Sequence, residues 1–243
     1  MIWALHGFLG RGADWDDLGR ALARAGAPAL LAPDLFTRPP HTRSLAEWGA
    51  EFAAEVAAEA TAPILLGYSL GGRLALHALL AAPERWRRAV IVSAHPGLTD
   101  PRERAERRRD DERWAVRFER EPWDRLLQAW DARAVFGGTP TTRARPEAAF
   151  DRTALAAALR VWSLGAQDDL RPALERLTIP VLWIAGARDA RYVTLAEEAC
   201  DRLPRGTVAI APDTGHRVPW ERPGWFAERV TTFLQDVDER GER

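Results

Sequence analysis

The sequence contains no lysine and no asparagine, and all 34 of its basic residues are arginine. Without lysine, the chain cannot form a Schiff base with a carbonyl substrate, anchor pyridoxal phosphate or build a P-loop. Without asparagine, it has no N-glycosylation acceptor and no Cys-His-Asn triad. A biased genomic composition explains most of the arginines, yet recognition of any anionic substrate must fall on guanidinium groups.

Cysteine is nearly absent as well, because Cys200 is the only one among 243 residues. One thiol cannot form an internal disulfide, and no group of cysteine and histidine residues has the spacing of a zinc site. We therefore expect a reducing compartment and no metal.

Long apolar runs are also missing. The run at 2–5 is far too short for a signal peptide, and no stretch approaches the ~20 apolar residues that a membrane span needs. The formal net charge of −1 argues against a nucleic-acid partner. We expect a cytoplasmic, water-soluble enzyme or binding protein without membrane association, and nothing in the sequence indicates an obligate protein partner.

Short apolar runs alternate with longer helical patterns along most of the chain. Six runs are typical of buried strands: 2–5, 29–32, 63–67, 89–93, 180–185 and 207–211. This alternation predicts an α/β protein with about six mostly parallel strands, flanked by helices on both faces. Ser44 and Glu47 form a capping-box pattern that opens a helix running to about Ala60.

The alternation breaks between about residues 96 and 165, where helical segments bearing arginine and tryptophan replace the strands. We interpret residues 96–165 as a helical cap inserted after the strand that ends near Ser93. Residues 1–95 and 166–243 then form a single α/β core. The densest charge run, 102–125, has nearly equal numbers of acidic and basic residues, which is typical of a solvated helix.

Ser69 lies in the pentapeptide Gly67-Tyr68-Ser69-Leu70-Gly71, directly after a predicted strand and before a helical pattern. This is the G-x-S-x-G nucleophile elbow of the α/β-hydrolase fold, in the context that the motif requires. Glycine is needed at both ends of the motif for a steric reason. The sharp turn strains the backbone of the serine, and close neighbouring chains leave no room for side chains on either side of it.

Asp189 and His216 follow the last two predicted strands, which gives the chain order Ser, Asp, His of the α/β-hydrolases. In this interpretation Ser69 is nucleophile or base, His216 exchanges its proton, and Asp189 orients and stabilises the imidazolium. Asp213 is the alternative acid. Asp189 is preferred because it lies at the C-terminal end of a strand.

Two backbone groups complete the expected catalytic set. The N–H of Phe8, after the first strand, and the N–H of Leu70 together predict an oxyanion hole. His95 follows a strand at the same edge of the sheet as Ser69. For His95, a contact with the substrate and a structural role are equally compatible with the sequence.

Several segments outside the elbow share motifs with one group of α/β-hydrolases: Ser93-Ala94-His95-Pro96-Gly97-Leu98, Arg104-Ala105-Glu106-Arg107, Asp111, Trp114, Arg117-Phe118, Glu121-Pro122 and Trp130. With the segment from Gly67 to Arg73, they resemble the menaquinone-pathway 2-succinyl-6-hydroxy-2,4-cyclohexadiene-1-carboxylate synthases. The resemblance extends from His6 to Glu221 and includes the cap. It implies a lyase that uses a catalytic triad, without a cofactor, to eliminate pyruvate from an enolpyruvyl cyclohexene that carries a succinyl group.

The substrate implied by this resemblance is a small anion with three carboxylates, so cations are expected around it. Arg73 lies four residues after Ser69 and shares its helix face with apolar neighbours. Since a buried charge that loses its partner costs ~3–5 kcal/mol, Arg73 needs a carboxylate; we favour the substrate over a structural salt bridge. Arg107 lies on a stripe with Asp111 and Trp114, which predicts an inward-facing position.

Three further substrate contacts are expected from the resemblance. Tyr68 and Trp130 match pocket positions of the family, although either residue is as easily explained by packing. A third cap arginine has no unambiguous register. The candidates are Arg143, Arg145 and Arg152, of which Arg152 is closest to the predicted helix at 154–159.

Two other functions are consistent with the same residues. A serine carboxylesterase or related hydrolase acting on a small ester would use the same triad, with the arginines stabilising the cap. A non-catalytic α/β-hydrolase-like binding module is disfavoured because the set of catalytic residue types is intact.

Overall fold

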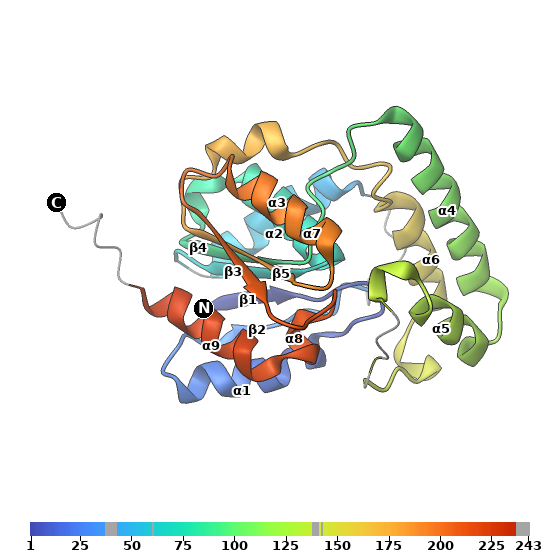
Figure 1. Ribbon diagram of the computed structural model, residues 1–243, viewed down its shortest axis with the longest axis horizontal. Coiled ribbons are helices and arrows are strands. Elements are labelled where there is room, and N and C mark those ends of the chain that lie inside the picture. The colour runs from blue at the N-terminus through green and yellow to red at the C-terminus, as the bar shows by residue number, and fades with distance from the viewer. Residues whose placement is uncertain (37–42, 60, 138–140, 142, 237–243) are drawn as a thin grey trace.

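The strands of the computed structural model form one parallel sheet in the order β2-β1-β3-β4-β5-β6 (Figure 1). The structure describes residues 1–36, 43–59, 61–137, 141 and 143–236. The strands are β1 (Ile2–Leu5), β2 (Leu30–Leu31), β3 (Ile64–Tyr68), β4 (Arg88–Val92), β5 (Val181–Gly186) and β6 (Gly206–Ala211). The six strands expected from the sequence are thus confirmed, with ends displaced by at most one residue.

Both faces of the sheet are covered by helices, which is why its central strands are continuous apolar runs. Residues of α1 (Asp16–Arg24) and α9 (Pro223–Gln235) pack against one face. Residues of α2 (Leu45–Glu59), α3 (Leu70–Ala81) and α7 (Ala190–Cys200) pack against the other. Figure 1 shows these two layers below and above the strands, with the short α8 (Val218–Glu221) on the side of α9.

The expected capping box at the start of α2 is confirmed. The backbone N–H of Ser44 donates to Glu47 Oε2 across 2.8 Å, and the N–H of Glu47 donates to Ser44 Oγ across 3.3 Å. Each side chain thereby satisfies a backbone donor that the first turn of a helix leaves without a partner.

Between β4 and β5 the described residues form no strand. The chain there forms α4 (Pro101–Arg120), α5 (Trp123–Asp131) and α6 (Arg152–Val161), joined by short 3-10 turns. These helices lie together at one end of the sheet (Figure 1). Aromatic packing joins two of them, because the ring of Trp130 in α5 lies 5.0 Å from Trp114 and 5.4 Å from Phe118 of α4, measured between centroids.

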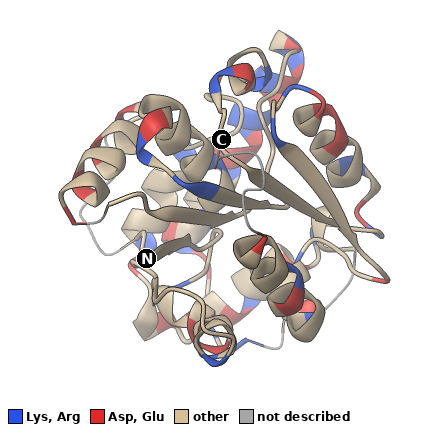
Figure 2. Ribbon diagram, turned by 90° about the vertical axis from the view of Figure 1, so that its left-hand side faces the viewer, with Lys and Arg blue, Asp and Glu red and all other residues tan. Residues whose placement is uncertain are grey.

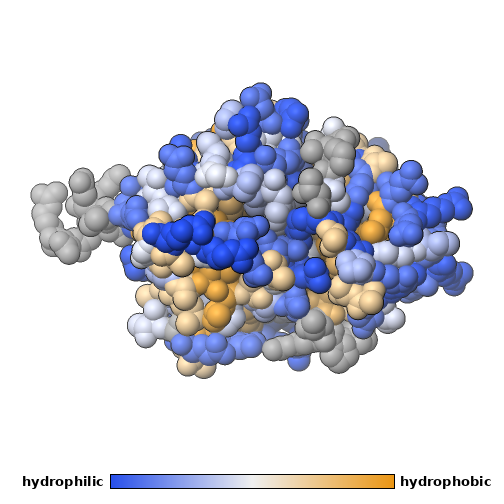
Figure 3. Space-filling view, turned by 90° about the horizontal axis from the view of Figure 1, so that it is seen from below, coloured by the Kyte–Doolittle hydropathy of each residue, from blue (hydrophilic) through white to orange (hydrophobic). Residues whose placement is uncertain are grey.

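Charge is distributed over the helices and loops rather than concentrated. Acidic and basic residues are interspersed on the helices, while the strands are almost free of them (Figure 2). The side that carries α1 and α9 is covered mainly by hydrophilic residues, with smaller hydrophobic areas between them (Figure 3). Within the described ranges, no helix is both long enough and apolar enough to cross a membrane.

The direction in which the strands are added to the sheet changes between β1 and β3. β2 pairs with one side of β1, and β3 pairs with the other. The connection that leaves β1 therefore runs to one side, and the connection that leaves β3 runs to the opposite side. Ligands of open α/β sheets bind outside the carboxyl ends of the strands at such a point. Phe8 and Ser69 follow these two strands.

Candidate active site

Ser69 stands in a strained turn between β3 and α3. Its φ and ψ are 52° and −112°, in a region that residues with side chains seldom adopt, and its N–H donates to the carbonyl of Val92 across 2.8 Å. The space beside it is closed: a Cβ on Gly71 would lie 2.2 Å from the carbonyl oxygen of Leu5. The steric reason expected for the elbow glycines is therefore confirmed.

The structure brings Ser69, His216 and Asp189 together. His216 Nε2 lies 3.1 Å from Ser69 Oγ, and His216 Nδ1 lies 2.8 Å from Asp189 Oδ2. These contacts have the geometry of a serine nucleophile, a base and a carboxylate that orients the base. The alternative acid, Asp213, instead lies at the surface, where its carboxylate contacts Arg222.

A cavity of about 420 Å³ opens above Ser69. Phe8 and Leu70, the residues expected to form the oxyanion hole, both line it. Leu70 is the first residue of α3, and the first N–H groups of a helix have no acceptor within that helix. Backbone donors beside the serine are thus available to an oxygen that develops negative charge.

Arg73 lines this cavity from α3 and is only 7% exposed. Its Nε donates to Gln167 Oε1 across 2.6 Å, but its Nη2 has no hydrogen-bond partner among the described residues. Burial, reinforced by the nearby Arg107 guanidinium, lowers the pKa of Arg73 to about 9. A bound anion would relieve this cost of burying the charge.

Arg107 also lines the cavity, as the helical stripe predicted. Its Nε donates to both carboxylate oxygens of Asp111, at 2.9 and 2.8 Å. Asp111 is almost fully buried and accepts a further hydrogen bond from the Ser163 hydroxyl at 2.7 Å. Arg107 is therefore held at the cavity by a fixed carboxylate.

Tyr68 and Trp130 line the cavity as well, and both also belong to packed aromatic groups. The ring of Tyr68 packs edge-on against Trp220 at 4.7 Å, and burial raises the pKa of its hydroxyl. The ring of Trp130 lies 4.8 Å from Phe8. The two interpretations left open by the sequence, packing and cavity lining, both apply to these residues.

Arg152 does not line the cavity. Its guanidinium donates to the backbone carbonyls of Phe118 and Glu121 and to the Glu147 carboxylate. The physical reason is its place at the first position of α6, beside the end of α4, where the last helical carbonyls need donors. The expectation that Arg152 binds substrate is corrected accordingly: this residue joins two helices.

Two cavity arginines were missed by the sequence reasoning. Arg133 follows Trp130 by three residues, and its guanidinium lies 4.5 Å from the centroid of the Trp130 ring. Arg191 lies in the first turn of α7, two residues after Asp189. The spacing of each from a predicted site residue was the available signal.

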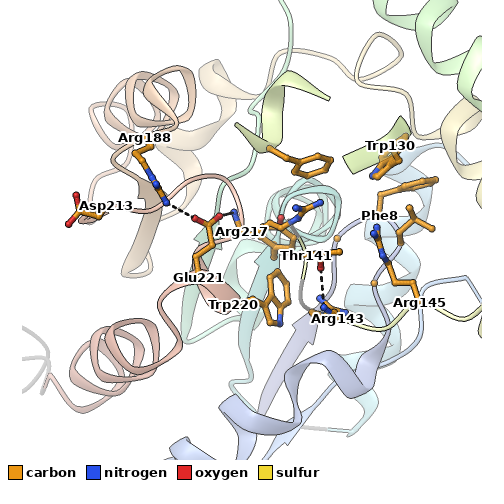
Figure 4. Close-up of a pocket in the computed structure, with 15 residues that line it drawn as sticks. Phe8, Trp130, Thr141, Arg143, Arg145, Arg188, Asp213, Arg217, Trp220 and Glu221 are labelled. Carbon is orange, nitrogen blue, oxygen red and sulfur yellow. Dashed lines mark hydrogen bonds and ion pairs between the residues drawn. The ribbon is translucent and has the colours of Figure 1, made fainter. Parts of the chain in front are cut away.

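A second pocket of about 330 Å³ lies beside the cavity and shares Phe8, Tyr68, Trp130 and Phe136 with it. Figure 4 shows the arginines around this pocket, including Arg143 and Arg145, two of the candidates for the third cap arginine. Each has a carboxylate partner: Arg143 contacts Asp14, and Arg145 contacts Asp131. Within the described chain, no group of three or more histidine, cysteine or acidic residues could hold a metal.

A sequence profile described as the alpha/beta hydrolase family matches residues 4–229. The chain belongs to this family. It is similar to the 2-succinyl-6-hydroxy-2,4-cyclohexadiene-1-carboxylate synthase of Pectobacterium atrosepticum, with 36% identity over 95% of this chain and 92% of the relative. The synthase of the same name from Yersinia pseudotuberculosis is 35% identical over 96% of this chain and 86% of the relative.

Solved structures share the fold. MenH from S. aureus has a TM-score of 0.84 and 21% identity, covering 96% of this chain and 92% of that one. A thermophilic esterase from Thermogutta terrifontis has a TM-score of 0.74 and 18% identity, covering 96% and 88%. These structures establish the α/β-hydrolase fold, which by itself hosts many reactions.

Proposed function

We propose that this chain is a carbon–oxygen lyase that forms 2-succinyl-6-hydroxy-2,4-cyclohexadiene-1-carboxylate by eliminating pyruvate from an enolpyruvyl precursor, as a step of menaquinone biosynthesis. The observation that carries the proposal is the cavity above Ser69, because arginines surround a complete Ser-His-Asp arrangement. A generic esterase has no need for buried cations at this place. The identity of about 35% to synthases over nearly the whole chain supports the same reaction.

The first step is removal of a proton from the ring carbon conjugated to the succinyl ketone. His216 Nε2 and Ser69 Oγ form the hydrogen-bonded pair that takes this proton, and Asp189 stabilises the resulting imidazolium. The electron pair of the C–H bond moves to the ketone oxygen, which becomes an enolate. The N–H groups of Phe8 and Leu70 are the donors that stabilise this oxygen.

The second step breaks the bond between the ring carbon and the enolpyruvyl oxygen. The enolate electrons return to the ring and form its second double bond, and pyruvate departs as its enolate. That enolate takes up one proton at carbon, so the proton removed from the ring balances the reaction. The chemistry requires no water, metal or cofactor.

The substrate carboxylates are the groups that the cavity arginines bind. Arg73 has a buried nitrogen directed to no protein acceptor among the described residues, and Arg107 is fixed by Asp111. Arg133 replaces Arg152 as the third cap arginine in this proposal. Tyr68 and Trp130 supply the aromatic wall against which the ring of the substrate packs.

The division of the chain follows from the same proposal. Residues 1–95 and 166–243 form the core that carries Ser69, Asp189 and His216, and residues 96–165 form a cap that covers the substrate and supplies arginines to it. A cytoplasmic location suits a biosynthetic enzyme with a small anionic substrate.

The decisive test is release of pyruvate from the enolpyruvyl substrate by purified protein, followed by a coupled assay. We expect Ser69→Ala and His216→Gln to lower kcat by at least about 100-fold, because each removes a member of the proton-transferring pair. Hydrolysis of short p-nitrophenyl esters is the counter-assay. Brisk ester hydrolysis without pyruvate release would instead establish an esterase.

A further inference from the structure

We propose that His95 and Arg191 form a carboxylate subsite at one side of the cavity. The proposal rests on the proposed function, since it identifies where one carboxylate of the substrate binds. Both residues line the cavity above Ser69, and His95 Nε2 and Arg191 Nη2 lie 3.4 Å apart.

The hydrogen bonds of His95 fix its tautomer. The backbone N–H of Gly97 donates to His95 Nδ1 across 3.0 Å, so Nδ1 carries no proton. Burial, together with the charge of Arg191 and other arginines, lowers the pKa of His95 to about 3. A neutral imidazole whose Nδ1 is an acceptor carries its proton on Nε2.

The contact between His95 and Arg191 therefore joins two donors. A guanidinium has no acceptor atom, and His95 Nε2 carries its own hydrogen. If His95 carried its proton on Nδ1 instead, that N–H would face the N–H of Gly97, so two donors would meet at the shorter of the two contacts. The pair is satisfied when an acceptor with two oxygens receives a hydrogen bond from each nitrogen, as a carboxylate does.

The surroundings of the pair favour an anionic ligand. Among the described residues, no carboxylate forms an ion pair with Arg191. Two further buried donors of cavity residues, Ser93 Oγ and Arg73 Nη2, also have no partner there. Ser93 follows β4 directly and has a φ of 46°, so its backbone is strained at a position that lines the cavity.

The fixed and exposed members of the pair have different roles. His95 is 4% exposed, and Gln167 Nε2 donates to its backbone carbonyl across 3.2 Å while Gln167 Oε1 accepts from Arg73. His95 is thus a preorganised donor linked to Arg73 through one amide. Arg191 is exposed and lines the cavity, so it supplies the charge that attracts the anion.

Binding of pyruvate and, separately, of succinate to the full chain tests this subsite without turnover. Isothermal titration calorimetry compares Arg191→Gln and His95→Leu with His95→Gln, which keeps an N–H donor in place of Nε2. Arg202→Gln is the matched control, because Arg202 is an exposed arginine just beyond the same helix. Arg191→Gln is the variant least able to disturb folding.

We expect Arg191→Gln and His95→Leu to weaken binding of at least one probe by about tenfold or more, as for loss of a charge-assisted hydrogen bond, with His95→Gln less affected. Weakened pyruvate binding assigns the enolpyruvyl carboxylate, and weakened succinate binding assigns the succinyl carboxylate. In turnover, the same variants raise KM more than they lower kcat, a split that a merely structural role would not produce.

Two results would overturn the subsite: binding of both probes as tightly by Arg191→Gln and His95→Leu as by Arg202→Gln, or no binding of either probe by the unmodified chain. Failure of the synthase reaction is a separate result. It would be seen as absence of pyruvate release by the unmodified chain, whatever the calorimetry shows.

Discussion

Arg217 donates from Nη2 to Asp131 Oδ1 across 2.6 Å, and thereby ties α5 to the residue that follows His216. Arg145 donates to the other oxygen of Asp131. The side chains of Arg217 and Arg145 are about nine-tenths buried. One carboxylate thus fixes α5 against the loop that positions the proposed base. Figure 4 shows its two partners, Arg217 and Arg145, beside the second pocket.

Replacing this carboxylate is expected to destabilise the chain. Asp131→Asn removes the negative charge that faces the mostly buried guanidinium groups of Arg217 and Arg145, so we predict a loss of about 3 kcal/mol in the free energy of unfolding. Urea denaturation measures it. Glu84→Gln is the control, because it removes a carboxylate from an exposed ion pair and should change stability by no more than about 0.5 kcal/mol. Equal effects of the two substitutions would contradict the tie.

A second prediction is that alanine has opposite effects on stability at Gly71 and Gly19, because the space around the two glycines differs. Gly71→Ala places a Cβ 2.2 Å from the carbonyl oxygen of Leu5, so the elbow must shift, and a cost of at least about 3 kcal/mol is expected. Gly19→Ala is its opposite: the nearest atom is 3.8 Å away and the site is inside α1, so the substitution should stabilise by about 0.5–1 kcal/mol. Thermal unfolding of both variants checks the sign.

The fold was accessible from the sequence because each strand is a short apolar run between clear helical patterns. Strands that are buried on both faces need no alternation of polar and apolar residues, so they appear as continuous apolar runs. Signals such as the Ser44 capping box mark where the helices between them begin. The Ser69, Asp189 and His216 arrangement was accessible for a related reason. These residues follow strands whose carboxyl ends meet at one edge of the sheet.

The roles of the arginines in the proposed cap were harder to predict from the sequence, because the direction of each side chain depends on packing between helices distant in sequence. Arg107 has a periodic stripe that indicates its face, whereas Arg152 begins a helix and turns to the end of α4. Arg133 lies after the end of α5, where no periodicity fixes the direction of a side chain. Because every lysine or arginine position in this chain is arginine, residue type alone cannot separate the arginines that bind substrate from those that stabilise the fold.

Acid is predicted to destabilise the folded chain through its buried histidines. The pKa values of His6 and His77 are lowered from 6.5 to about 4, and that of His95 to about 3, in each case chiefly by burial. Between pH 6.5 and 4 the unfolded chain therefore binds more protons, and stability is lost as the pH falls through this window. His77→Gln should reduce the dependence by about 1 kcal/mol per pH unit, as measured by urea unfolding at several pH values. An unchanged dependence would show that His77 titrates normally.

Arg133 and Arg152 provide the last prediction, because the structure places Arg133 at the cavity and Arg152 between two helices. Arg133 lines the cavity, and the pKa of its guanidinium is lowered by burial and by nearby Arg107. We expect Arg133→Gln to raise KM for the enolpyruvyl substrate about tenfold or more, with little change in stability, through loss of a contact with a carboxylate.

Arg152→Gln should do the reverse. It removes the donors to the carbonyls of Phe118 and Glu121, so the free energy of unfolding should fall by about 1–2 kcal/mol while KM stays within about threefold. Steady-state kinetics and urea unfolding of the two variants, made in parallel, decide between the roles. An increase in KM confined to Arg152→Gln would restore Arg152 as the substrate arginine, because a residue that only joins α4 to α6 acts on stability before it acts on binding.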